Sequence, residues 1–202
     1  MKKFILLILV LTISLNTISC KKKETKENKV EKGFIVDTNK SEIHWTAYKT
    51  TDKVPVKGKF TKLNITKNSQ GKTYAETLNG TEFSIPVSSI FSNNADRDYK
   101  LKTLFFGVMK NADLLSGTIH IDDATSGYVD FDMNGVVEKL AFEYRTTENS
   151  IQISSIMDTS SWQAQAAIAS INNACLELHK GTDGVSKTWS DVSIDLSVYY
   201  KK

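Results

Sequence analysis

The chain has 202 residues, with 26 lysine or arginine residues against 23 aspartate or glutamate residues, and its net charge is +3. Lys2 and Lys3 supply two of these positive charges and Lys21–Lys32 supplies three more, so Gly33–Lys202 carries a net charge of −2. A nearly neutral domain without a basic stripe argues against a nucleic-acid-binding protein.

Residues 1–19 have the pattern of an export signal. Two lysines precede the apolar segment Phe4–Leu15, which is too short to span a membrane. The segment ends at a serine followed by Cys20, which resembles the lipobox of bacterial lipoproteins, although Thr17 departs from the usual leucine. In that family the cysteine becomes the first mature residue and carries the lipid. We therefore predict a lipoprotein signal peptide with lipid attachment at Cys20; the alternative is an ordinary secretory signal with an incidental cysteine.

The segment 20–32 is rich in lysine and glutamate and holds one apolar residue, Val30. It cannot bury a core, so we predict a flexible tether, whose basic residues could also contact anionic lipid head groups. The remaining residues, 33–202, are enough for one domain with a core. These features together predict a lipid-anchored protein of the cell envelope, at the outer membrane, on its periplasmic or surface face.

Alternation of apolar and polar residues predicts about eight strands. Asn134-Gly135 between two such segments indicates a tight hairpin, and Gly58 indicates a bulge or a point of tight curvature. The segments are Gly33–Thr38 leading into Ser41–Tyr48, Val54–Ile65, Thr73–Val87, Leu114–Ile121, Tyr128–Met133, Val136–Tyr144, Ser150–Met157 and 191–198.

Two segments have helical periodicity instead. In Asn94–Met109, apolar residues recur at helical spacing and Asn94 is a suitable cap; the stripe consists of Leu101, Leu104, Phe105, Val108 and Met109. Ser160–His179 has a second stripe that includes Cys175, which we expect to be a buried structural thiol. If Cys20 is acylated, Cys175 has no disulfide partner.

Long alternating strands joined by hairpins favour an antiparallel sheet that closes into a barrel, because closure removes exposed edges. The predicted fold class is therefore all-β with minor α: an eight-stranded antiparallel barrel with two helices. A barrel of this size either is filled by side chains or holds one small ligand.

Several motifs, in this order, resemble those of YceI-like proteins. They are Val36-Asp37 with Ser41, Ile43 and Trp45; Val56-Lys57-Gly58-Lys59-Phe60; Arg97-Asp98 with Leu101 and Leu104-Phe105-Phe106; Asn134-Gly135-Val136; and Lys187-Thr188-Trp189-Ser190-Asp191 before the last strand. The resemblance covers about Gly33 to Tyr200. It implies a lipocalin-like barrel that binds a polyisoprenoid or a fatty-acid derivative in an apolar lumen, without enzymatic activity. Lys40 and Lys100 stand where the family often has histidine, and the second helix looks longer than usual.

Candidate ligand-binding residues follow from the alternation and the resemblance together. Most of the aromatic residues must belong to the core, and some of them are expected to line a cavity. Arg97 is a possible head-group contact, although a helix-cap ion pair with Asp98 is the simpler interpretation. The predicted lumen residues are Trp45, Phe60, Phe83, Leu101, Phe105, Phe106, Met109, Phe131, Phe142 and Leu196.

Chemistry beyond binding is not indicated. His44, His120 and His179 lack metal-ligand spacing, and no nucleophile motif or phosphate-binding glycine loop is present. We expect no cofactor and no catalytic residue. The prediction is an anchored protein that binds a long-chain amphiphile for storage, transport or stress protection. The alternative is a scaffolding or adhesion lipoprotein with a solid barrel, and an enzyme is the third choice.

Overall fold

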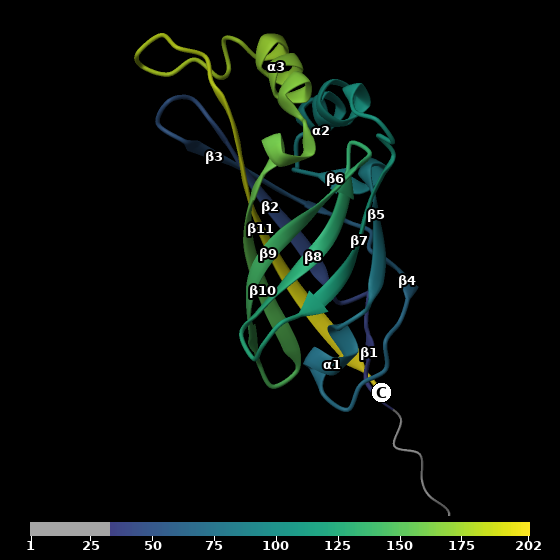
Figure 1. The fold of residues 1–202 in the computed structure, drawn as a ribbon. Coiled ribbons are helices and arrows are strands. Elements are labelled where there is room, and N and C mark those ends of the chain that lie inside the picture. Colours follow the sequence, from purple (N-terminus) through teal and green to yellow (C-terminus); the bar gives the residue numbers. More distant parts are fainter. Residues whose placement is uncertain (1–32) are drawn as a thin grey trace, which may run out of the picture. The chain divides into compact units, whose positions relative to one another are not determined.

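The computed structural model describes residues 33–202 (Figure 1). The predicted signal peptide over 1–19, the anchor Cys20 and the charged segment 20–32 lie outside the described residues. Most of the described chain consists of β-strands, as predicted. No helix within residues 33–202 combines the length and the apolar character needed to cross a membrane.

The described chain forms an antiparallel sheet of eleven strands, whereas the sequence predicted eight. The difference arises because two predicted segments are each split in two and because the two-residue β6 is too short to show a pattern. Neighbouring strands follow the order β4-β5-β7-β8-β9-β10-β11-β2-β3-β6, and β1 pairs with β11. The strands are β1 (Ile35–Val36), β2 (Glu42–Lys49), β3 (Val54–Phe60), β4 (Asn64–Lys67), β5 (Glu82–Pro86), β6 (Ile90–Phe91), β7 (Leu114–Ile121), β8 (Ser126–Met133), β9 (Val136–Thr146), β10 (Ser150–Asp158) and β11 (Thr188–Lys201).

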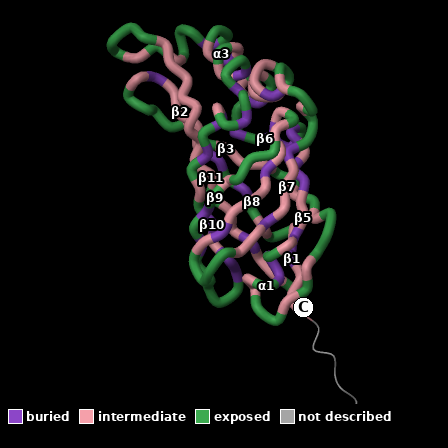
Figure 2. Tube along the Cα trace, viewed as in Figure 1, coloured by how far each residue is buried: buried purple, intermediate pink, exposed green. Residues whose placement is uncertain are grey.

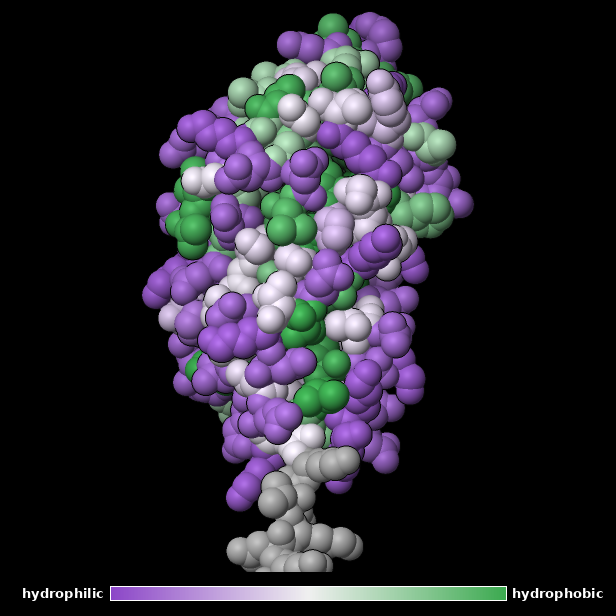
Figure 3. Space-filling view, turned by 90° about the vertical axis from the view of Figure 1, so that its right-hand side faces the viewer, coloured by the Kyte–Doolittle hydropathy of each residue, from purple (hydrophilic) through white to green (hydrophobic). Residues whose placement is uncertain are grey.

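The chain itself brings the two ends of this sheet together. Only the 3-10 turn η1 (Val87–Ser89) separates β5, near one end of the sheet, from β6 at the other. Four Cα–Cα steps span at most roughly 15 Å, so the sheet must curl until its edges approach. Thr61, which follows β3, donates its backbone N–H and its hydroxyl to Ser89 O at 2.9 and 3.1 Å. The result is a barrel-like sheet, and on the side that carries β4 and β5 apolar side chains are visible between hydrophilic ones (Figure 3).

Strand alternation decides which side chains point into the barrel. In β2, Ile43 and Trp45 are buried, whereas His44 between them is exposed. Buried segments lie along the barrel, and the loops at its ends are mostly exposed (Figure 2). The buried side chains form two clusters, one that includes Trp45 and one that includes Leu78.

One predicted strand, Thr73–Val87, begins as a helix. α1 (Tyr74–Leu78) precedes β5, because a capping box overrides the alternating pattern. Thr73 Oγ1 accepts the Glu76 backbone N–H at 3.1 Å, and Glu76 Oε2 accepts the Thr73 backbone N–H at 3.4 Å. Leu78, 1% exposed, packs with residues of β1, β7 and β10. We call this end of the barrel, with α1 beneath it, the closed end (Figure 1).

The predicted helix 94–109 is present but irregular. Asn94 caps it as predicted, by accepting the Arg97 backbone N–H at 2.9 Å. α2 (Ala95–Lys100) then widens into the π-helical turn η2 (Leu101–Phe105) and tightens into the 3-10 turn η3 (Phe106–Val108). The changed pitch rotates the later side chains away from the ideal stripe. Val108 is therefore 50% exposed, and Phe106, which the stripe omits, is buried.

The second predicted helix, Ser160–His179, is shorter than expected. The chain first forms the 3-10 turn η4 (Thr159–Trp162), and α3 covers only Gln165–Ala174. Gln163 between them has a φ of 56°, and a left-handed residue cannot continue a right-handed helix. Cys175, with non-helical backbone angles, ends the helix before Gly181. α2 and α3 lie together at the end opposite α1, which we call the mouth (Figure 1).

The predicted hairpin at Asn134-Gly135 is confirmed. Met133 pairs with Val136, and the two turn residues have φ values of 58° and 67°. Positive φ at both positions is the requirement of a type I′ turn, which asparagine and glycine meet at low cost.

Candidate ligand-binding site

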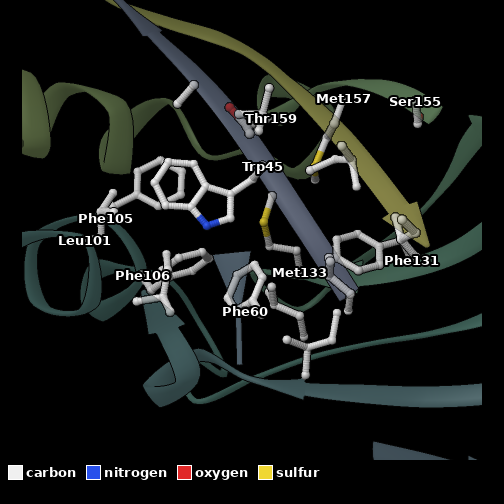
Figure 4. A pocket seen from close by; sticks show the side chains of 18 of the residues that line it. Trp45, Phe60, Leu101, Phe105, Phe106, Phe131, Met133, Ser155, Met157 and Thr159 are labelled. Atoms are coloured by element: carbon white, nitrogen blue, oxygen red, sulfur yellow. The ribbon is translucent and has the colours of Figure 1, made fainter. Parts of the chain in front are cut away.

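An elongated cavity of about 500 Å³ extends through the barrel from the closed end to the mouth. Its lining includes Leu78 of α1 at one end and Lys100 of α2 at the other. The lining side chains between the two ends are mostly aliphatic, aromatic or thioether groups, as the middle of the cavity shows (Figure 4). All of its charged lining residues lie at the mouth. The cavity is thus amphipathic along its length.

β11 gives a measure of the length of this cavity. Val198 lines it near the closed end and Thr188 lines it near the mouth, ten residues away along the same strand. Ten strand residues span roughly 33 Å, and a strand tilt of about 40° reduces this to roughly 25 Å along the barrel axis. A volume of about 500 Å³ over that length describes a narrow channel, which suits one flexible chain.

Trp45 forms the central part of the wall, and Gly58 makes room for it. The two residues are cross-strand partners in β2 and β3, and the pairing is regular through this position. Of the two predicted alternatives at Gly58, a bulge or tight curvature, the bulge is therefore wrong. A Cβ atom at residue 58 would lie 2.2 Å from Trp45 Cζ2. The absent side chain lets the indole lie over the neighbouring strand. The Trp45 indole N–H is buried and has no hydrogen-bond partner among residues 33–202.

The same arrangement recurs at two other aromatic residues. Phe142 of β9 is paired with Gly127 of β8, and a Cβ there would lie 2.7 Å from Phe142 Cζ. Phe83 of β5 is paired with Gly117 of β7, with a corresponding distance of 3.1 Å. Aromatic rings over glycines lie along the wall, so they line the lumen without filling it.

Trp162 of η4 holds another lining residue, Phe131, in place. The Trp162 indole N–H donates to Phe131 O at 2.7 Å, and the two rings meet edge to face at 5.9 Å. Asn134 Nδ2 in turn donates to Trp162 O at 2.9 Å, which ties η4 to the β8–β9 hairpin. Trp162 is 2% exposed. Its role was not predicted, because the helical periodicity of 160–179 indicated that Trp162 lies in the first turn of a long helix.

Three apolar side chains of η2 and η3 approach the lumen from the mouth. Leu101, Phe105 and Phe106 lie on the side of Trp45 that faces these turns (Figure 4). The Phe105 and Phe106 rings are 5.0 Å apart and nearly perpendicular, at 84°. In a regular helix, adjacent residues point about 100° apart. The change from π to 3-10 pitch allows both phenylalanines to line the same cavity.

Arg97 and Asp98 do not form the predicted ion pair with each other. Both bind Ser92, just after β6. Asp98 Oδ1 accepts the Ser92 backbone N–H at 2.9 Å and also the Ser92 hydroxyl. Arg97 Nε and Nη2 donate to Ser92 Oγ and Ser92 O, both at 2.7 Å. This buried contact fixes the start of α2, and Arg97 also lines the mouth of the cavity.

Two lysines line the mouth without a carboxylate partner in the described part of the chain. Lys49 ends β2, and its Nζ donates to Leu178 O at 2.9 Å. Lys100 ends α2. The ion pairs found within residues 33–202 involve neither of them. From the sequence, Lys100 stood out only as a departure from the family pattern, and nothing in the local pattern singled out Lys49.

His179 lies between α3 and β11 and completes the mouth. Its Nδ1 is 2.7 Å from Thr188 Oγ1, and the Thr188 hydroxyl donates to Asn172 Oδ1 at 2.9 Å. Because an amide oxygen can only accept, Thr188 Oγ1 has its hydrogen committed and accepts from His179 Nδ1–H. Burial, followed by the charges of Lys49 and Lys100, lowers the pKa of His179 from its ordinary value of 6.5. The imidazole is therefore neutral at pH 7.

Nearly all of the predicted lumen residues line the same cavity. Met109 is the exception, because it packs against the core cluster of Trp45 instead of lining the cavity. Met133 and Met157 also line the cavity and were not among the predicted lumen residues, although Met133 alternates in phase with Phe131 and Met157 alternates in phase with Ile153. The predicted residues that line the cavity are Trp45, Phe60, Phe83, Leu101, Phe105, Phe106, Phe131, Phe142, Leu196 and the possible head-group contact Arg97.

Cys175 and two of the three histidines have surroundings that account for them without catalysis or metal binding. Cys175 is a buried free thiol that lines the cavity, as predicted for its burial. His44 Nε2 lies 3.4 Å from Glu42 Oε2, and His120 Nε2 lies 3.0 Å from Asp130 Oδ2. Within residues 33–202, no three histidine, cysteine, aspartate or glutamate side chains gather where they could hold a metal ion.

Comparisons with known proteins give a family match and a shared fold. The family model described as the YceI-like domain matches residues 34–199. A polyisoprenoid-binding domain from Saccharophagus degradans, implicated in plant cell wall breakdown, is similar in structure, with a TM-score of 0.60, 14% identity and coverage of 85% of this chain and 99% of that one. No protein in the curated comparison matches the sequence.

Two further solved structures share the fold. BcnA of Burkholderia cenocepacia has a TM-score of 0.55 and 12% identity, with coverage of 83% of this chain and 99% of that one. A YceI protein of Campylobacter jejuni has a TM-score of 0.51 and 16% identity, with coverage of 73% and 85%. The mostly antiparallel, barrel-like β fold predicted from the sequence is thereby confirmed.

Proposed function

Because the chain belongs to the YceI-like domain family, we propose that it binds one long-chain amphiphile, a polyisoprenoid or a fatty-acid derivative, inside its barrel. The observation that carries this proposal is the narrow apolar cavity of about 500 Å³, whose charged lining residues all lie at one end. The apolar chain lies in the lumen with its tip toward the closed end, and the head group stays at the mouth. The solved polyisoprenoid-binding domain with the same fold supports this choice of ligand.

The energetics favour a long chain over a short one. Each buried methylene contributes about 0.8 kcal/mol, so ten to twenty carbons contribute roughly 8–16 kcal/mol. Association costs about 4–15 kcal/mol, which offsets most of the gain from a short chain. Affinity should therefore rise with chain length, and binding should show a negative heat-capacity change. The match to the YceI-like domain family supports a role in binding, and we propose no reaction for this protein.

The test has two steps. Organic-solvent extraction of the purified protein, followed by mass spectrometry, should release a long-chain lipid. Calorimetric titration of the stripped protein with a homologous series of isoprenoid alcohols should then show affinity that increases with each added unit. Affinity independent of chain length, together with the absence of a co-purified lipid, would leave the scaffolding alternative as the better account.

We also propose that the protein is anchored to the cell envelope, at the outer membrane, by lipid on Cys20. This proposal rests on the sequence of residues 1–32 alone. Two or more acyl chains hold a protein stably at a membrane, whereas one holds it only marginally. The Cys20→Ser variant should therefore appear in the soluble envelope fraction after cell fractionation. A Cys20→Ser protein that stays with the membranes contradicts the anchor and leaves the binding function untouched.

A further inference from the structure

We propose that the mouth of the cavity is an anion-binding site, so that the protein selects long-chain amphiphiles whose head group is a phosphate or a carboxylate. This inference rests on the proposed function, because it concerns the head of the molecule whose chain occupies the lumen. It adds a chemical class that neither the family match nor the similar folds specify.

Positive charge predominates among the charged residues that line the cavity. Lys49, Arg97 and Lys100 carry positive charges at the mouth, and Asp96 is the one carboxylate of the lining to oppose them. The rest of the lining carries no charge, so the charged groups of the mouth lie next to a region of low dielectric constant. Charges near such a region interact more strongly than they do in bulk water. Arg97 shares Ser92 with the buried carboxylate of Asp98, so the charges that an anion would offset there are chiefly those of Lys49 and Lys100.

The basic side chains at the mouth come from separate elements and line the same cavity. Lys49 belongs to β2, Lys100 to α2, and His179 to the connection between α3 and β11. All three line the same cavity, and both lysine charges act on the His179 imidazole. Surface lysines usually repel one another or pair with carboxylates. Here neither lysine has a carboxylate within 4.0 Å among residues 33–202.

Hydrogen bonds fix the orientation of the His179 imidazole. The Thr188 and Asn172 side chains hold its Nδ1–H, so Nε2 is the atom left for a ligand. Asp96 and Arg97 face the same opening from α2, and Glu177 is held by Lys180 at 2.7 Å. A bound anion offsets the charges of Lys49 and Lys100, which together with burial keep the pKa of His179 low. His179 Nε2 can then take up a proton and donate to the anion.

The experiment compares ligands that share a chain and differ in the head group. The pairs are geranylgeranyl phosphate against geranylgeraniol, and hexadecanoate against hexadecanol; inorganic phosphate is the control without a chain. Wild-type protein, stripped of lipid, should bind each anion about tenfold or more tightly than its matched alcohol, a difference of about 1.4 kcal/mol. The preference should shrink as salt is added, because the lysines are partly exposed.

The variants test whether the named lysines carry this preference. Lys49→Gln combined with Lys100→Gln should remove the preference, so that each anion binds no more tightly than its matched alcohol. Lys57→Gln combined with Lys62→Gln removes the same charge from exposed positions away from the cavity and should keep the preference. In proton NMR titrations, the pKa of His179 should rise in the complex with geranylgeranyl phosphate and should not rise in the complex with geranylgeraniol.

The outcomes separate this inference from the proposed function. Equal affinity of the wild-type protein for anions and alcohols overturns the anion site, while the binding of both still supports the apolar lumen. A preference that survives the double lysine variant also overturns it. A larger preference for the phosphate than for the carboxylate supports the site with a polyisoprenoid phosphate as its source, and the reverse supports it with a fatty acid. Failure of all four long-chain ligands to bind contradicts the proposed function itself.

Discussion

The closed end and the mouth of the barrel differ in how far their side chains are exposed. At the closed end, Leu78, Thr77 and Thr81 are at most 1% exposed, and the Thr81 hydroxyl donates to Thr77 O at 2.8 Å. At the mouth, the backbone passes through α, π and 3-10 turns, and Leu176 and Leu178 are 48% and 61% exposed. The closed end is a packed base, whereas the mouth is an irregular rim where Lys49 and Lys100 have no carboxylate partner among residues 33–202.

This difference indicates that the closed end mainly stabilises the fold, whereas the mouth mainly contacts the ligand. The fully buried side chains of α1 and its surroundings should give the closed end the larger share of the stability. The mouth contributes less to stability, and it carries the groups that can contact a ligand. Functional groups are often found where a structure is less well packed, because a binding site needs surface that the fold itself does not use. Substitutions at the two ends should therefore separate folding from binding.

The largest expected effect is on stability at the closed end. Leu78→Ala should lower the free energy of unfolding by about 2–5 kcal/mol, because it removes fully buried methyl groups and leaves a cavity. Leu176→Ala at the mouth makes the same chemical change at an exposed position and should change stability by less than about 0.5 kcal/mol. Urea denaturation followed by circular dichroism measures both. Equal losses in the two variants would contradict the difference between the ends.

A charge in the lumen should abolish binding. Phe131→Asp places a carboxylate among apolar side chains, where an unpaired charge is strongly unfavourable, so a long-chain alcohol should no longer bind. Ile156→Asp introduces the same charge on a side chain that is 75% exposed, and binding should stay intact. Circular dichroism must show that both variants are folded. Binding by a folded Phe131→Asp protein would show that the ligand does not occupy this part of the lumen.

A smaller change in the same wall should weaken binding without removing it. Gly58→Ala puts a methyl group where Trp45 Cζ2 would be 2.2 Å away, so the indole must shift toward the lumen. We expect about tenfold weaker binding of a long-chain alcohol and a shift of the tryptophan fluorescence. Lys57→Ala, the exposed neighbour on the same strand, should have neither effect. Unchanged affinity in Gly58→Ala would mean that the position of Trp45 does not limit the channel.

The thiol of Cys175 reports on access from the mouth. In a Cys20→Ser protein, Cys175 is the only cysteine, and its 7% exposure should make alkylation slow until the protein unfolds. A bound long-chain ligand should slow alkylation further, because Cys175 lines the cavity. An added thiol at Leu176→Cys, an exposed neighbouring position, should react quickly. Fast alkylation of Cys175 in the folded protein would show that the mouth opens more widely than its contacts indicate.

The smallest expected effect is a pH dependence at the mouth. Burial and the charges of Lys49 and Lys100 lower the pKa of His179 in the folded protein, so the unfolded chain binds its proton more tightly. Stability from this group is therefore complete above the ordinary pKa of 6.5 and decreases as the pH falls through that value toward the lowered pKa. The decrease should be smaller in His179→Gln, measured by urea denaturation at pH 7.5 and 5. An equal decrease in both proteins would assign the pH dependence to other groups.

Local pattern was sufficient to predict much of the fold. Alternation in β2 and β11 predicted strands with one buried face, and Asn134-Gly135 predicted the tight hairpin, because these features depend on neighbouring residues alone. The capping box of α1 was also local, but it was hidden because alternation was given more weight than the pairing of Thr73 with Glu76. Most of the predicted lumen residues line the cavity for the same reason that the strands were predictable: period two places them on one face.

Sequence alone therefore determined the β character of the domain, its hairpin and the inward face of its strands, since each follows from the period of the backbone and from short-range turn chemistry. Only the tertiary structure decided the rest. Whether the lumen is open depends on Trp45, Phe83 and Phe142 lying over glycines of neighbouring strands, which is a matter of register between distant segments. The basic mouth likewise exists because residues 49, 100 and 179, far apart in the chain, meet where the barrel ends.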